Sequence, residues 1–377
     1  MTHTTSSIDP DRLWRAFDIL QDWLDEGVVT AVASVVVHRG RIAGEFYGGK
    51  TAPAFDALPI NGASLFHIAS IGKPMTAFAV MTLVEAGRLA LDDPVSSILP
   101  AFRGAEREAI TVRQLLTHTS GLPQDPDCSR LPPDVSTSDE LRTYLHARPV
   151  VPPGSKVEYS NVGYGLLGLI IEEVSKKPFA TFMRERVFTP AGLHDAWLAP
   201  PDDLVPRIVH VDGTLDPGSP TERFNSAYAR RQTHPAGSVL ATARDVARFF
   251  QVFLNGGVID GRQVISPAAA RLMVTNQTSG LRGGIEGFMT WDDCAWGLGF
   301  DLRGAKRPHF SGEFTSPNTF GHAGVSGVFA WADPALDLVC VMLANRTLFD
   351  LWNVSRWSRF STAVVASLTG VPQSPHR

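Results

Sequence analysis

The sequence predicts an α+β protein, in which an antiparallel β-sheet flanked by terminal helices carries an inserted all-helical domain. Runs rich in β-branched and apolar residues lie near both ends of the 377-residue chain, whereas the middle alternates helical patterns with proline-rich loops. Strands from both ends of the chain can pair in one sheet if the middle of the chain forms a separate domain inserted between them. We therefore expect a discontinuous sheet domain (residues 1–90 and 231–377), a helical insertion domain (residues 91–230) and an active site in the cleft between them.

The first expected elements are a helix and a hairpin. Asp9 can cap a helix that Pro10 opens, and apolar residues then recur at helical spacing from Leu13. Two β-rich runs, at residues 30–38 and 41–47, are separated by a short turn. This pattern predicts an antiparallel hairpin.

The stretch around Ser70 predicts the next helix. Proline is tolerated only in the first turn of a helix, so Pro74 places the helix start close to Ser70. Apolar residues continue at helical spacing to Glu85, and Gly87 supplies a stop.

The rest of the chain first shows helices and then returns to strands. Helical patterns occupy residues 111–117 and 163–174, with proline-rich loops at residues 131–134 and 151–154. Thr242 and Asp245 stand at capping-box spacing and open a helix that is expected to end at residue 254. The expected late elements are strands at residues 296–302, 325–332 and 336–344 and a closing helix at residues 348–369.

Composition favours an enzyme that acts on small molecules. The net charge is only -4 and no block of like charges occurs, so we expect no nucleic-acid or membrane partner. The three cysteines, Cys128, Cys294 and Cys340, are scattered and odd in number, which suits a reducing compartment. No signal peptide and no apolar run long enough to span a bilayer is evident. These observations predict a cytoplasmic protein.

Ser70 and Lys73 are the first candidate catalytic pair. Residues three apart share one face of a helix, so the lysine amine can approach the serine hydroxyl. A helix N-terminus also favours developing negative charge. Ser70 is therefore a candidate nucleophile and Lys73 its partner, although a capping serine followed by a solvated lysine would look the same.

Tyr159 and Asn161 are the second candidate pair. Two residues apart in an extended loop, they project to the same side. A tyrosine beside a lysine ammonium can be held deprotonated, or the two groups can share one proton and act as a base. A buried tyrosine followed by a turn asparagine is the structural alternative.

His322, Gly324 and Val325 lie in a run of small residues at the head of an apolar strand. Glycine there lets a substrate lie along the backbone, and the N–H of Val325 can join that of Ser70 in an oxyanion hole. Free histidine titrates at about pH 6.5, so acidification is expected to charge His322 and help it bind anionic substrates. A packed histidine at the start of a glycine-rich strand is the alternative.

Together, Ser-x-x-Lys at Ser70, Tyr-x-Asn at Tyr159 and His-x-Gly at His322 resemble three motifs of the serine β-lactamase and penicillin-binding superfamily. The most similar branch is the class C-like one, and the chain resembles its family VIII carboxylesterases. The likeness extends over roughly residues 12–345 and includes residues 115–122, 153–161 and 236–245. The resemblance implies a sheet with an inserted helical domain, and acyl transfer through a serine ester without metal or cofactor.

Carried over by position, the resemblance assigns the nucleophile to Ser70, the base and acid work to Lys73 and Tyr159, and substrate orientation to Asn161. One departure matters, because many members that bind β-lactams or peptides have lysine where this chain has His322. The histidine variant resembles the esterase-like members.

Other catalytic signatures fit less well. Gly163, Gly165 and Gly168 match a dinucleotide-binding pattern, but they follow a turn-rich segment rather than a buried parallel strand. No Gly-x-Ser-x-Gly and no His-Glu-x-x-His occurs.

We therefore expect a serine carboxylesterase that acts on a small-molecule ester through an acyl-enzyme on Ser70, with no cofactor and no metal. The alternatives left open are a β-lactamase, a D-amino-acid peptidase or amidase, and an acyltransferase of the same fold. A non-catalytic receptor of the penicillin-binding type is an alternative of another class. The sequence leaves the natural substrate and the oligomeric state open.

Overall fold

The computed structural model describes residues 7–104, 106–126, 134–212, 222–347 and 351–370. Some sequence-based expectations fall outside these residues. They concern the polar N-terminus before Ser7, Cys128, most of the loop at residues 131–134 and the start of the closing helix at residues 348–350.

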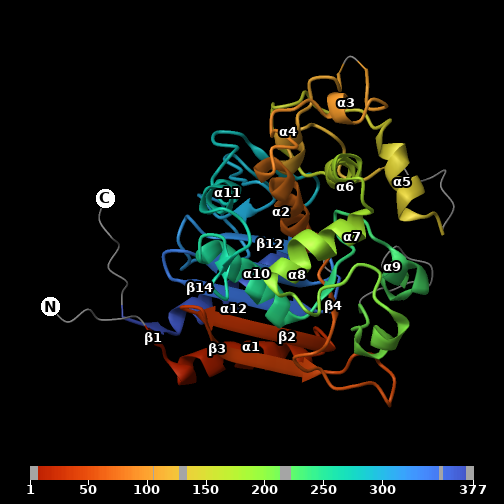
Figure 1. Ribbon diagram of the computed structural model, residues 1–377. Coiled ribbons are helices and arrows are strands. Elements are labelled where there is room, and N and C mark those ends of the chain that lie inside the picture. Colours follow the sequence, from red (N-terminus) through yellow and green to blue (C-terminus); the bar gives the residue numbers. More distant parts are fainter. Residues whose placement is uncertain (1–6, 105, 127–133, 213–221, 348–350, 371–377) are drawn as a thin grey trace.

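A six-stranded antiparallel sheet takes its strands from both ends of the chain, which confirms the predicted fold class. Figure 1 shows the red strands β2 and β3 beside the blue strand β14. Val35 pairs with Val341 across this junction of the two chain ends. In spatial order the strands are β11 (Asp301–Leu302), β12 (Phe320–Gly324), β13 (Val328–Asp333), β14 (Leu338–Ala344), β2 (Ala31–His38) and β3 (Arg41–Gly49).

Helices cover both faces of the sheet, because successive side chains of a strand point to opposite faces. On one face, Val36 and Trp331 share an apolar cluster with α1 (Pro10–Asp25) and α12 (Leu351–Ala366). On the other face, Val35 and Ala330 belong to the cluster that contains α2 (Gly72–Glu85) and α10 (Ala243–Leu254). The central strand β2 is consequently buried along its whole length.

Two helix starts follow the predicted capping residues. The Asp9 carboxylate accepts a hydrogen bond from the backbone N–H of Arg12 at 3.2 Å, and α1 begins at Pro10. The Thr242 hydroxyl accepts one from the N–H of Asp245 at 3.2 Å. The Asp245 carboxylate does not complete the box, because it accepts a hydrogen bond from the N–H of Asp195.

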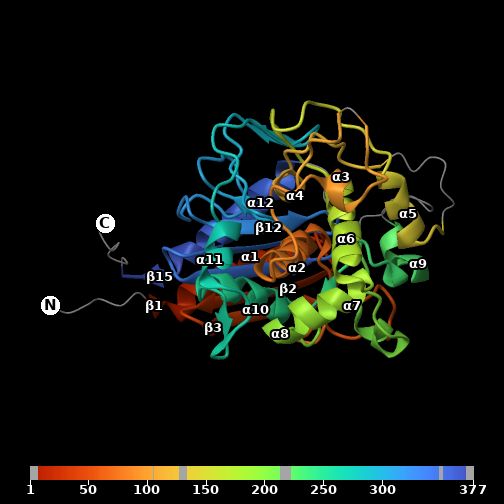
Figure 2. The same cartoon turned by 45° about the horizontal axis from the view of Figure 1, so that its top comes forward.

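The middle of the chain supplies short helices around α2. Helix α2 packs against α6, which lies beside it in Figure 2, and its residues Gly72 to Leu83 are buried on all sides. Within the described residues the helices here are α3 (Val95–Ile98), α4 (Val112–Leu116), α5 (Thr137–Tyr144), α6 (Asn161–Ser175), α7 (Phe179–Met183), α8 (Thr189–Ala191) and α9 (Ala227–Arg231).

Several small strand pairs tie distant parts of the chain together. Strand β5 (Val157–Glu158) joins β9 (Gly283–Ile285) and β10 (Met289–Trp291), and so links the helical middle to the C-terminal half. The expected division of the chain at residues 90 and 230 stays a prediction. The other strand pairs among the described residues are β1 (Ser7–Ile8) with β15 (Leu368–Thr369), β4 (Phe66–His67) with β6 (Leu240–Ala241) and β7 (Val258–Ile259) with β8 (Arg262–Gln263), and helix α11 (Pro267–Met273) follows β8.

Two of the predicted strands are wrong in extent. Of residues 296–302, only β11 is a strand, because Trp296 and Asp301 form an isolated bridge and the chain turns at Gly299, whose φ is +88°. Of the strand expected at residues 325–332, only residues 328–332 are a strand, in β13, because residues 325–327 form the turn that joins β12 to β13. Gly327 makes that turn with a φ of +92°, and its N–H donates to Gly324 O at 3.0 Å.

In the part of the chain that the structure describes, no helix combines the length and the apolar character needed to cross a bilayer. Cys294 and Cys340 are both buried and unpaired.

Candidate active site

Ser70 lies in a strained turn that leads into the buried helix α2. Strand β4 precedes the turn, residues Ala69–Ile71 form one turn of 3₁₀ helix, and α2 starts at Gly72. Ala69 has a φ of +45°, a left-handed conformation that costs free energy for alanine. The predicted helix start is correct, and the Ser70 side chain is half-buried at this point.

Lys73 lies one turn further along and contacts Ser70 directly. Its Nζ is 2.9 Å from Ser70 Oγ and donates a hydrogen bond to Ala236 O at 2.9 Å. The side chain is fully buried, and burial lowers the pKa of the amine to about 7, an effect that the Asp125 carboxylate partly opposes. A neutral amine at this distance can take the proton of the serine hydroxyl.

Tyr159 packs against Lys73, whose Nζ is 4.8 Å from the centre of the tyrosine ring. Burial raises the pKa of the phenol well above its usual value, and a hydrogen bond with the Ser70 side chain opposes this only in part. The expectation that Tyr159 is deprotonated, or shares one proton with Lys73, is therefore wrong. Near pH 7 Tyr159 keeps its proton while Lys73 can lose one, so the lysine is suited to be the base and the tyrosine the acid.

Asn161 reaches the same cavity from another kind of element than expected. It is the first residue of α6, whose cap is Ser160, rather than part of an extended loop. Its Nδ2 donates to Asp125 Oδ1 at 2.6 Å, and both residues line the cavity around Ser70.

The His322 side chain is buried and stays neutral near pH 7. It lies on β12, is 3% exposed, and donates from Nδ1 to Ala323 O at 2.7 Å. Its Nε2 is buried without a hydrogen-bond partner among the described residues. Burial lowers the pKa of His322 to about 3, and the nearby Lys73 adds to the effect. The expectation that mild acidification charges this residue is therefore wrong.

Gly324 lets the end of β12 pack closely against the Ser70 turn. A β-carbon at this position would lie 2.9 Å from Ile68 O and 3.0 Å from the Ala69 side chain. Two residues later, the Ser326 hydroxyl donates to His67 O. Val325 consequently lines the same cavity as Ser70, as an oxyanion-hole contributor must.

His118 is a site residue that the sequence reasoning missed, because it belongs to none of the three motifs. Its Nδ1 accepts from the N–H of Ser160 at 3.0 Å and its carbonyl accepts from the N–H of Glu158 at 2.7 Å. Its ring centre lies 4.4 Å from that of Tyr159. His118 therefore holds the backbone on both sides of the tyrosine and packs on its ring, which only the folded chain reveals.

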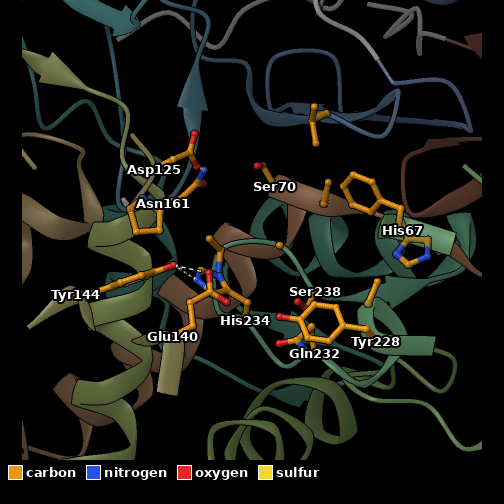
Figure 3. A pocket seen from close by; sticks show the side chains of 17 residues that line it. His67, Ser70, Asp125, Glu140, Tyr144, Asn161, Tyr228, Gln232, His234 and Ser238 are labelled. Atoms are coloured by element: carbon orange, nitrogen blue, oxygen red, sulfur yellow. Dashed lines mark hydrogen bonds between the residues drawn. The ribbon is translucent and has the colours of Figure 1, made fainter. Parts of the chain in front are cut away.

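Two cavities meet at Ser70. One has a volume of about 320 Å³ and is lined by residues of the helical middle such as Tyr144 and Tyr228; Figure 3 shows it, with Ser70 facing Asp125 and Asn161. The other has a volume of about 500 Å³ and a wall of aromatic and apolar side chains that includes Trp296. An ester bound at Ser70 can thus place its two halves on different sides of the nucleophile.

Fold and site together define a serine hydrolase of the Ser-x-x-Lys kind, in which a buried lysine contacts the serine and a tyrosine packs against that lysine. The model of the family described as "Beta-lactamase" matches residues 17–357. The chain therefore belongs to the β-lactamase family.

Individual relatives agree with this assignment. Penicillin-binding protein 4 of Amycolatopsis lactamdurans is 31% identical over 336 residues, which cover 85% of this chain and 78% of that protein. A penicillin-binding protein homologue from Caulobacter crescentus superposes with a TM-score of 0.80 at 26% identity, and the match covers 97% of this chain and 100% of that one. A family VIII carboxylesterase has the same fold, with a TM-score of 0.79 at 21% identity over 96% of this chain and 100% of its own.

Proposed function

We propose that this serine hydrolase cleaves carboxylic esters through a covalent acyl-enzyme on Ser70. The observation that carries the proposal is the contact between a buried lysine amine and the serine hydroxyl, at 2.9 Å, in a cleft where the third motif supplies a neutral imidazole.

The proposed reaction has two steps, acylation of Ser70 and deacylation by water, and the same residues act in both. Neutral Lys73 takes the proton of Ser70 as Oγ attacks the ester carbonyl, and the N–H groups of Ser70 and Val325 stabilise the developing oxyanion. The bond to the leaving oxygen then breaks, Tyr159 gives that oxygen its proton, and the lysine ammonium restores the proton of the tyrosine. Water repeats the sequence as the nucleophile and releases the acid from Ser70.

The charges of the cleft support esters over β-lactams and peptides with a free carboxylate. Those substrates need a cation beside the carboxylate, and a charge-assisted hydrogen bond exceeds a neutral one by about 1 kcal/mol. His322 stands where many relatives have lysine, and its lowered pKa keeps it neutral. Among the described residues that line the two cavities, none is lysine or arginine.

The test compares substrates on the unmodified protein. Nitrophenyl butyrate is expected to be hydrolysed with a kcat/KM well above that of nitrocefin, and an initial burst of nitrophenol is expected to report the acyl-enzyme. Equal or faster turnover of nitrocefin would replace the esterase proposal by a β-lactamase one. The absence of any burst or turnover would favour the non-catalytic receptor.

A D-alanyl peptidase or penicillin-binding activity is the second candidate. It is supported by the name of the relative from Amycolatopsis lactamdurans, penicillin-binding protein 4. A peptide that ends in D-Ala-D-Ala separates the two candidates, because a peptidase releases free D-alanine from it and an esterase of the proposed kind does not.

A further inference from the structure

Asp125 is a carboxylate on the wall of the cleft. The residue lines both cavities, as Ser70 does, and Figure 3 shows it beside Asn161 across the cavity from the nucleophile. Its charge also reaches the catalytic groups, because the carboxylate counts among the causes that raise the pKa values of Lys73 and Tyr159. A charged group on a bound substrate would feel the same field.

The neighbours of Asp125 orient its carboxylate without neutralising it. Asn161 donates to Oδ1 at 2.6 Å and Gln124 donates to Oδ2 at 3.2 Å, and both side chains are uncharged amides. Across the stretches that the structure describes, no lysine or arginine forms an ion pair with Asp125. The carboxylate of Asp125 is therefore oriented by two amides on an exposed part of the cavity wall, where a ligand can reach it.

The described side chains that line the smaller cavity with Asp125 carry no positive charge near pH 7, although the Arg230 guanidinium outside this lining acts on His67. Glu140 lines the smaller cavity and accepts a hydrogen bond from the Tyr144 hydroxyl at 2.9 Å. Burial lowers the pKa of His67 to about 4 and that of His234 to about 3, so both imidazoles are neutral near pH 7.

Two further carboxylates, Glu286 and Asp301, line the larger cavity. Asp301 forms an ion pair with Lys306, and Glu286 lies 3.3 Å from Lys156, which it shares with Glu158. Asp125 and Glu140, by contrast, form no ion pair among the described residues, and both line the smaller cavity.

Aromatic rings complete this compartment. Tyr144, Phe224 and Tyr228 line the smaller cavity together with the two carboxylates. The faces of aromatic rings attract cations, and rings beside carboxylates are a combination that binds ammonium groups. A ligand with a carboxylate would instead be repelled by Asp125 and Glu140.

We propose that the cleft selects esters that carry an amine cation or a quaternary ammonium group, held in the smaller cavity by Asp125 and the neighbouring rings. This inference rests on the proposed esterase function and adds to it the charge class of the substrate. Asp125 is then a specificity-determining residue, because it touches the cationic part of the substrate and not the reacting atoms.

The experiment uses matched substrates that differ only in charge. On the acyl side, the nitrophenyl ester of 4-(trimethylammonio)butyrate is paired with that of 5,5-dimethylhexanoate, in which carbon replaces nitrogen. On the alcohol side, acetylthiocholine is paired with S-(3,3-dimethylbutyl) thioacetate. Each rate is divided by that of alkaline hydrolysis, which removes the intrinsic reactivity of the ester.

In at least one pair, the cationic member is expected to have a kcat/KM about tenfold above its isostere at low salt, and the advantage should shrink as salt screens the carboxylate. In Asp125→Asn the ratio within that pair should fall to near one. Because both members are measured on the same enzyme, any shift in the pKa of Lys73 cancels. Glu286→Gln is the matched control and should keep the ratio, because Glu286 lines the larger cavity and not the smaller one, and its carboxylate is paired with Lys156.

The outcomes separate this inference from the proposed function. Rapid hydrolysis of the neutral esters without any advantage for the cationic ones, or an unchanged ratio in Asp125→Asn, would overturn the inference and leave the esterase proposal standing. If no ester in either pair is hydrolysed, the proposed function fails and the inference fails with it.

Discussion

At the scale of single residues, the chemistry of the site depends on how burial changes Lys73. The ammonium form of a lysine loses its hydration when the side chain is buried, which favours the neutral amine. Because the pKa is lowered to about 7, a large share of the molecules carries a free base at neutral pH. An exposed lysine at the same spacing would be almost fully protonated.

The first prediction concerns pH. We expect kcat/KM for a nitrophenyl ester to rise with pH through a midpoint of about 7, since Lys73 must lose its proton before it can accept one from Ser70. Because the pKa of Tyr159 is raised, the tyrosine loses its proton, and the enzyme its activity, only at far more alkaline pH. A pH profile of the unmodified protein is the measurement, and a constant kcat/KM between about pH 6 and pH 8 would contradict the assignment of the base.

The second prediction concerns the nucleophile. Ser70→Ala should lower turnover by several orders of magnitude and abolish labelling by a fluorophosphonate, with little effect on folding because alanine is a good helix residue. Ser238→Ala is the matched control, since that serine lines the smaller cavity, whereas the hydrogen bonds of Lys73 in the described structure go to Ser70 and Ala236. Mass spectrometry locates the label. Labelling of the Ser70→Ala protein at the parent rate would place the nucleophile elsewhere.

The third prediction tests His118 as a positioning residue. His118→Ala removes the acceptor for the Ser160 N–H and leaves alanine at a φ of +57°, so we expect a loss of stability of about 2 kcal/mol and a fall in kcat. His118→Asn keeps an acceptor and tolerates this φ, but it lacks the ring that packs on Tyr159. It should therefore recover most of the stability and only part of kcat. Full recovery of kcat by asparagine would show that the ring has no part in holding Tyr159.

At the scale of elements, the site depends on how β12 meets the Ser70 turn. The strand ends at Gly324, close to Ile68 and Ala69, and this contact sets the position of Val325 relative to the nucleophile. Strands and helices hold catalytic groups more accurately than loops do, so a change at this junction should be felt mainly in the rate.

The fourth prediction follows from this contact. In Gly324→Ala the new methyl group would lie 2.9 Å from Ile68 O and 2.8 Å from the Val328 side chain, so β12 must move away from the turn. We expect a fall in kcat of about tenfold or more and a stability cost of about 1–3 kcal/mol. Ala323→Ser, one residue earlier and partly exposed, is the control. Steady-state kinetics and thermal unfolding are the measurements. An unchanged kcat in Gly324→Ala would contradict the prediction.

At the scale of the whole molecule, the sheet separates the Ser70 turn from most of the cluster under α1 and α12, although the larger cavity reaches Val354 and Trp357 of α12. Helices α1 and α12 cover the face opposite the one on which α2 and α10 pack, and they form their own apolar cluster with it. Phe360 is fully buried in this cluster, against Phe17, Trp23 and Phe329.

The fifth prediction uses this separation. Phe360→Ala should lower the free energy of unfolding by about 3–5 kcal/mol, because it removes a buried ring and leaves a cavity. The KM and kcat of the folded protein should stay close to those of the parent. Trp14→Ala is the control, because Trp14 lies on α1 but is 56% exposed. Denaturant unfolding and kinetics on the same samples test this, and a large change in KM would show that the two faces are coupled.

The sequence alone determined the features that depend on neighbours along the chain. Asp9 and Pro10 start α1, and Pro74 places Ser70 at the beginning of α2, because caps and proline act within one helical turn. The spacing of Ser70 and Lys73 likewise predicts their contact, since residues three apart share a helix face. The runs of β-branched and apolar residues near both chain ends predicted the common sheet.

Only the tertiary structure decided the features that depend on contacts between distant segments. The protonation states of Lys73 and His322 follow from burial by segments far along the chain, and so the sequence-based expectations for Tyr159 and His322 were wrong. The role of His118 arises because folding brings it against Tyr159, forty-one residues later in the sequence. The strand boundaries around Gly299 and Gly327 were missed for the same physical reason: a turn is fixed by the pairing partners on either side, and local pattern does not contain them.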